Sequence, residues 1–168
     1  MRWIRPALAV LILVLGTSLV AAPAVLAAPK KERIVTVTHG PVTPTLVQGS
    51  GLGAIRTFTG TTAVNGVAGP NTLFTGTLTT VSVDLPGNRE LRSSNLIFIF
   101  GSEANQMVVG GISVYPADGS TLAPGTQTIR PILGGSGTYN GARGYVVSTN
   151  MGAQGWSHVF HIIRDARP

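Results

Sequence analysis

From residue 33 onward, apolar and polar residues alternate along the chain with a period of two. No stretch of this region places apolar residues at helical spacing, and glycine, proline, asparagine or aspartate interrupts the alternation roughly every dozen residues. The pattern therefore predicts an all-β chain. Its eight expected strands are Arg33–His39, Ala54–Val64, Thr72–Leu85, Asn95–Gly101, Gln106–Tyr115, Gln127–Leu133, Arg143–Asn150 and Trp156–Arg164.

Eight antiparallel strands with short connections form either a closed barrel or a two-sheet sandwich, and periodicity alone does not separate the two. The last expected strand is apolar on both faces. Alternation puts one set of residues on one face (Trp156, His158, Phe160, Ile162) and a second set on the other (Ser157, Val159, His161, Ile163). In a barrel one set faces the lumen. The other set then requires a neighbouring subunit or a covering N-terminal segment.

The first residues have the layout of a secretory signal peptide. Arg2 and Arg5 precede an apolar run that ends in small residues, and cleavage is expected after Ala27. The alternative is an uncleaved anchor formed by Ala7–Leu26, which could nearly span a bilayer. We expect a secreted protein that meets a membrane only through this segment during export. Sequencing the N-terminus of exported material tests this, with a start near Ala28 expected and an intact, membrane-bound Met1 form contradicting it.

Residues 28–52 are then an N-terminal extension with the first strand, and residues 53–168 complete a single barrel domain. The chain carries a net charge of +6 and no cysteine, so disulfides, thiol catalysis and cysteine metal sites are excluded. Many basic residues lie near the two ends of the chain, and no internal basic cluster with interleaved aromatic residues occurs. Nucleic acid is therefore not an expected partner.

Residues 132–144 read ILGGSGTYNGARG and are unusually rich in glycine. The glycine spacing does not fit a dinucleotide-binding loop, and no helix pattern or Walker-type lysine follows. Strand patterns flank the segment closely on both sides, so a sharp corner between two strands explains the glycines best. The glycines assigned to this structural corner are Gly134, Gly135, Gly137, Gly141 and Gly144.

The same segment resembles the G-G-[ST]-G-x-[FY]-x-x-A-R-G signature of dirigent proteins, and it is similar to the G-G-S-G-x-F-x-G-A-x-G stretch of allene oxide cyclases. The resemblance extends from about Asn95 to Arg164. Both families share an eight-stranded antiparallel barrel, so the resemblance implies a barrel rather than a sandwich. It further implies a homotrimer and a small, largely apolar molecule bound in the barrel and oriented for ring closure or stereoselective coupling, without a cofactor.

Three residues are candidates for chemistry under this resemblance. Arg143 matches the arginine of the signature and would bind an oxyanion or carboxylate; the alternative is a structural role in which it binds carbonyls of the corner. His39 matches the histidine of the His-Asp pair that often ends the first strand of plant dirigent proteins, although Gly40 replaces the acid. Glu103 is the acid between two core-like strands and a candidate acid or base; the alternative is a solvated loop glutamate.

Other catalytic arrangements are not supported. No G-x-S-x-G elbow occurs, and His158 and His161 lie three residues apart in a strand, which puts their rings on opposite faces and argues against a metal site. Two further functions remain open. One is a non-catalytic carrier of a hydrophobic molecule, and the other is an oligomeric envelope protein with a filled barrel. An open lumen with an ionisable group favours a cyclase-like protein, and a packed lumen favours the structural protein.

Overall fold

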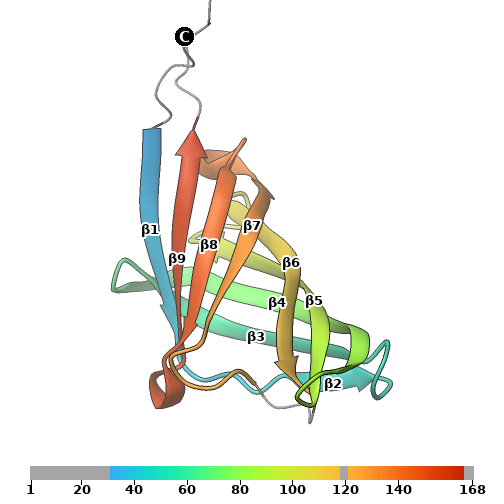
Figure 1. Cartoon of the computed structure of the whole chain (residues 1–168). Coiled ribbons are helices and arrows are strands. Elements are labelled where there is room, and N and C mark those ends of the chain that lie inside the picture. The colour runs from blue at the N-terminus through green and yellow to red at the C-terminus, as the bar shows by residue number, and fades with distance from the viewer. Residues whose placement is uncertain (1–30, 118–120, 165–168) are drawn as a thin grey trace, which may run out of the picture.

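The computed structural model describes residues 31–117 and 121–164, so the expected signal segment lies outside the described residues. Nine strands and two short 3-10 turns make up this part of the chain (Figure 1). The strands are β1 (Lys31–His39), β2 (Thr45–Gln48), β3 (Ile55–Val64), β4 (Val67–Leu85), β5 (Arg89–Phe100), β6 (Gln106–Pro116), β7 (Gln127–Gly135), β8 (Arg143–Asn150) and β9 (Trp156–Arg164). The 3-10 turns are η1 (Gly137–Tyr139) and η2 (Gly152–Gln154).

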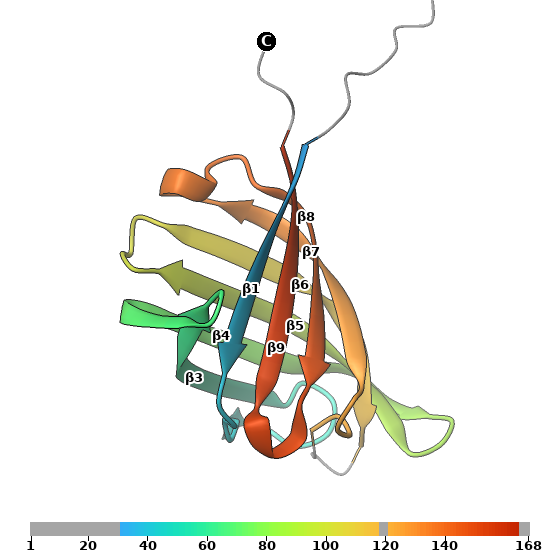
Figure 2. The same cartoon turned by 90° about the vertical axis from the view of Figure 1, so that its left-hand side faces the viewer.

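The strands form one antiparallel sheet that closes on itself. Their order is β1-β9-β8-β7-β6-β5-β4-β3-β2, and an additional pairing joins β1 to β3. Nine residue pairs join β1 to β9, whereas Val37 and Thr38 alone pair with β3, opposite Val64 and Ala63. Figures 1 and 2 show β1 beside β9 and the curvature that brings β3 round to this edge. The predicted eight-stranded barrel is confirmed, and β2 is one extra strand.

Two strands begin well before the residues at which the sequence pattern starts them. β4 starts at Val67 rather than Thr72, and β5 starts at Arg89 rather than Asn95. The early part of β5 carries Glu90 and Arg92 at positions that alternation assigns to the barrel interior, which gives this segment the composition of a loop. Both side chains are nevertheless buried, and the segment pairs with β4 and β6.

One half of the barrel interior is packed with apolar side chains. The alternate residues of β1, β6, β8 and β9 face inward and are almost completely buried. They include Val35, Val37, Met107, Val109, Val146, Phe160 and Ile162. Burial of these aliphatic and aromatic groups is the main stabilising contribution to a barrel that has no disulfide.

The glycine-rich corner connects β7 to β8 at the packed end of the barrel. Gly137, Gly141 and Gly144 have φ values of +56°, +74° and +128°, which side chains rarely adopt. Gly135 has no positive φ, but a Cβ there would lie 2.6 Å from the Tyr139 carbonyl oxygen. Gly134 is the exception, because its nearest neighbour would be Arg143 Nη1 at 3.8 Å. Four of the five corner glycines therefore occupy positions that disfavour a larger residue.

Candidate functional site

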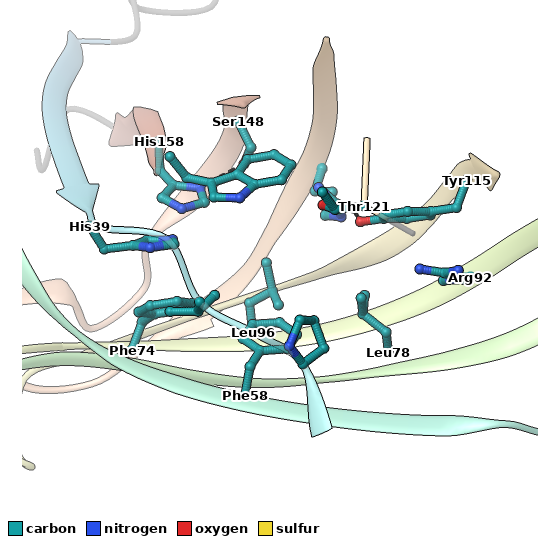
Figure 3. Close-up of a pocket in the computed structure, with 14 residues that line it drawn as sticks. His39, Phe58, Phe74, Leu78, Arg92, Leu96, Tyr115, Thr121, Ser148 and His158 are labelled. Carbon is teal, nitrogen blue, oxygen red and sulfur yellow. Dashed lines mark hydrogen bonds between the residues drawn. The ribbon is translucent and has the colours of Figure 1, made fainter. Parts of the chain in front are cut away.

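The other end of the barrel contains a partly open cavity of about 90 Å³ (Figure 3). It lies where β1, β6 and β8 end and where β5, β7 and β9 begin, opposite the glycine corner. Apolar atoms form most of the cavity surface, and the apolar and aromatic residues that line it are Val42, Pro44, Phe58, Phe74, Leu78, Leu96 and Trp156. The polar lining consists of His39, Arg92, Tyr115, Thr121, Arg130, Ser148 and His158.

Two histidines lie together at one side of this cavity. The His39 and His158 rings are stacked with centroids 5.1 Å apart, and His39 also stacks on Phe74 at 3.9 Å. The Nδ1 atom of His39 lies 2.6 Å from the Gly40 carbonyl oxygen, which can only accept, so this nitrogen carries a proton. His158 Nδ1 lies 2.8 Å from Ser148 Oγ, whereas His158 Nε2 is buried without a hydrogen-bond partner among the described residues.

Burial determines the protonation of both rings. Desolvation lowers the pKa of His158 well below its usual value of 6.5, and the nearby charges of His39 and Arg130 lower it further. Desolvation also lowers the pKa of His39, although its hydrogen bond to Gly40 acts in the opposite direction. His158 is therefore neutral near pH 7. A neutral imidazole with a free Nε2 can exchange a proton with a bound molecule.

A second cluster of polar side chains surrounds Arg130 of β7, which is buried and 3% exposed. Its Nε donates to Ser94 Oγ at 2.8 Å and its Nη2 donates to Tyr115 Oη at 3.1 Å. Its Nη1 donates to Thr128 Oγ1. All three partners are neutral hydroxyl groups. No carboxylate of the described residues forms an ion pair with this guanidinium.

A buried ion pair lies next to Tyr115. The Nε atom of Arg92 lies 2.5 Å from Glu90 Oε1, and the Arg92 guanidinium lies over the Tyr115 ring at 4.5 Å from its centroid. Glu90 also accepts a hydrogen bond from Thr80 and lies 3.9 Å from Arg56 Nη1. One carboxylate therefore faces two guanidinium groups at this end of the barrel.

The three candidate residues that the sequence analysis selects lie in different parts of the structure. His39 lines the cavity, whereas Arg143 and Glu103 are exposed near the opposite, packed end of the barrel. Arg143 Nη1 donates to the Ala142 carbonyl at 2.9 Å, the type of contact considered as its structural alternative. Glu103 lies in the loop between β5 and β6, as its solvated alternative describes. Neither of these two side chains can contribute to the cavity.

Sequence reasoning does not select Glu90, Arg92 or Arg130, and it considers His158 only as a metal ligand. The alternation of residues along β5 and β7 nevertheless indicates these charged positions. Residues 90, 92, 94, 96 and 98 alternate as inward positions, so two charged side chains occupy interior positions of β5. Arg130 likewise shares its face of β7 with the buried Ile132. Charged residues at inward positions of a strand indicate a polar lumen.

Within residues 31–117 and 121–164, no group of three or more histidine, aspartate or glutamate side chains could hold a metal ion. His158 faces the lumen, and His161, on the other face of β9, lies 2.8 Å from Glu32 and stacks on Tyr145. No helix in this part of the chain has the length and hydrophobicity needed to cross a bilayer.

Neither known family models nor curated protein sequences give a match to this chain. Among solved structures, the chain is similar to a protein named pyocyanin demethylase, with a TM-score of 0.54 and 13% sequence identity. The similarity covers 80% of this chain and 98% of that protein. At this identity the similarity supports the barrel fold alone. The specific resemblance to dirigent proteins and allene oxide cyclases stays a prediction.

Proposed function

We propose that this barrel binds a small, largely apolar molecule in its cavity and orients it for a cofactor-free ring closure or related rearrangement, with His158 transferring a proton. The observation that carries the proposal is the buried Nε2 of His158, which has no hydrogen-bond partner among the described residues and belongs to a side chain that lines an aromatic cavity. Buried polar atoms without a partner are rare in proteins, and a catalytic role or a partner that binds at the site is among their explanations.

The surroundings of His158 support this role. Ser148 binds Nδ1 of the ring, and the flanking rings of His39 and Phe98 lie 5.1 Å from it, so the imidazole has one fixed orientation. Aromatic walls hold a flat or folded apolar molecule by its surface, which places reacting atoms together before the chemical step. The solved structure with a similar fold is named for the modification of a small molecule. This proposal also retains the cyclase-like activity that the glycine-rich signature implies.

A carrier of a hydrophobic molecule is the second candidate function. The mainly apolar wall of the cavity favours it, because apolar burial alone can hold such a ligand. The structural protein with a filled barrel receives less support, because only the half of the lumen near the glycine corner is packed. The His158 ring distinguishes the first two functions, because a carrier does not need a proton-transfer group.

The first experiment is mass spectrometry of small molecules extracted from the purified protein, followed by incubation of that molecule with fresh protein. A cyclase-like protein converts the molecule into an isomer of the same mass. The variant His158→Gln is expected to reduce the conversion rate by about 10²–10⁴-fold, the usual contribution of a general acid or base. Its affinity for the molecule is expected to change much less, since the apolar wall stays intact.

The matched control is His161→Gln, the same substitution on the same strand but on the outer face. It is expected to leave conversion and binding unchanged. Unchanged recovery of the molecule after incubation with wild-type protein would support the carrier and contradict catalysis. A blocking variant, Val42→Trp at the half-buried edge of the cavity, is expected to abolish binding. Undiminished binding by that variant would contradict the location of the site.

A further inference from the structure

The cavity contains a positive charge that the described part of the protein does not neutralise. The side chain of Arg130 is almost fully buried, and its three hydrogen-bond partners are the uncharged hydroxyls of Ser94, Thr128 and Tyr115. A guanidinium has five N–H groups, so two of those on Arg130 have no partner among the described residues. A buried charge without a counter-ion is strongly unfavourable unless a ligand supplies the opposite charge.

The orientation of this guanidinium is fixed. Ser94 Oγ accepts from Arg130 Nε and itself donates to the Gly111 carbonyl oxygen at 3.0 Å, which anchors it to β6. Thr128 binds Nη1 from the same strand as Arg130. The donors that remain are therefore held in place before any ligand binds, as in sites that recognise planar anions.

Tyr115 provides a second donor at the same place. Its hydroxyl oxygen accepts the hydrogen bond from Arg130 Nη2, so its own proton is available to donate elsewhere. No acceptor for this proton occurs among the described residues, and the side chain belongs to the cavity wall. The Arg92 guanidinium lies over the Tyr115 ring, 4.5 Å from its centroid, and Glu90 balances its charge, so Arg130 is the cation without a counter-ion among the described residues. One oxygen of a ligand can thus accept from both Arg130 and Tyr115.

We infer that the molecule bound in this cavity carries an anionic oxygen, as a carboxylate or a phenolate, which is held by Arg130 and Tyr115 while its apolar body lies against the aromatic wall. This inference rests on the proposed function and narrows its ligand class. A carboxylate of the protein could also neutralise Arg130. Among the described residues, Glu90 is the buried acid, but its carboxylate contacts Arg92 and accepts a hydrogen bond from Thr80. It does not form an ion pair with Arg130.

Calorimetry of matched probe pairs binding to the purified protein tests the inference. Benzoate is compared with benzamide, which has the same shape without the charge, and 4-nitrophenolate is compared with 4-nitroanisole. For wild-type protein the anion of at least one pair is expected to bind about tenfold tighter than its neutral partner, or more, because charge-assisted hydrogen bonds are the stronger ones. Preference in the first pair identifies a carboxylate ligand, and preference in the second identifies a phenolate.

The variant Arg130→Met is expected to remove the preference for the anion and to leave the affinity for the neutral probe within about threefold, since the methionine keeps much of the apolar stem. Tyr115→Phe keeps the ring and is expected to reduce the preference by several-fold, which provides a test if Arg130→Met does not fold. The control is Arg143→Met, an exposed arginine at the packed end, which is expected to keep the full preference.

Equal affinity of wild-type protein for the charged and neutral members of both pairs overturns the inference, while binding of the neutral probes leaves the proposed function intact. Absence of binding by every probe contradicts the inference and the proposed aromatic binding site together. Preference for the anion that persists in both Arg130→Met and Tyr115→Phe overturns the assignment to these two residues.

Discussion

Glu90→Gln is expected to lower the free energy of unfolding by about 3–5 kcal/mol, the cost of breaking a buried ion pair by removing one partner. Glu90 is 2% exposed, and its carboxylate lies 2.5 Å from Arg92 Nε and 3.9 Å from Arg56 Nη1. Glutamine keeps the size of the side chain and one carbonyl acceptor but removes the negative charge. The two cations then repel each other in a poorly hydrated environment. Equilibrium unfolding in urea measures the loss.

The control is Glu103→Gln, the same substitution at an exposed position in the loop between β5 and β6. It is expected to change stability by no more than about 0.5 kcal/mol, as is usual for surface substitutions. Equal stabilities of the two variants would show that the carboxylate of Glu90 does not compensate the buried guanidinium groups. The effect is specific to charge, so the isosteric substitution is more informative than alanine, which would also create a cavity.

Gly144→Ala is expected to lower the free energy of unfolding by about 2–4 kcal/mol, from backbone strain together with overpacking. The φ of Gly144 is +128°, and a Cβ there would lie 1.9 Å from the His161 carbonyl oxygen on the adjacent β9. That oxygen belongs to the strand backbone, so neither partner can move without disturbing the pairing of β8 with β9. Thermal and urea unfolding of the purified variant measure the loss.

Two alanine variants in the same corner separate the causes. Gly141 has a φ of +74°, but a Cβ there would meet no neighbouring atom within 4 Å, so Gly141→Ala isolates the torsional cost, about 1–2 kcal/mol. Gly134→Ala has neither a positive φ nor a close contact and is expected to be nearly neutral. A loss at Gly134 as large as that at Gly144 would contradict the explanation from torsion and close approach.

The sequence predicts the fold well because each strand of a barrel repeats a simple local rule. Inward residues of β9 such as Phe160 and Ile162 alternate with outward ones, and glycines mark the corner, so strands and turns follow from periodicity. Closure is different. It depends on the pairing of Val37 and Thr38 in β1 with β3, which brings together residues that are far apart in the chain and leaves no periodic pattern.

The candidate site is less predictable for a related reason. His39 can be selected because a sequence signature matches it, whereas Arg130 and His158 become neighbours of the same cavity only after the barrel closes. The charged inward residues of β5 have the composition of a loop, and only their pairing with two neighbouring strands places them inside. Arg143 belongs to the most distinctive motif of the chain, yet that motif shapes the end of the barrel opposite the cavity.

Because side chains fill one half of the lumen, the cavity is closed on that side and does not run through the barrel. Under the proposed function, a molecule enters and leaves this cavity at the same end, so one molecule must leave before the next binds. The volume of about 90 Å³ is well below the roughly 300–1,000 Å³ of pockets for drug-sized ligands. Under the proposed function, a cavity of this size favours chemistry within one small molecule.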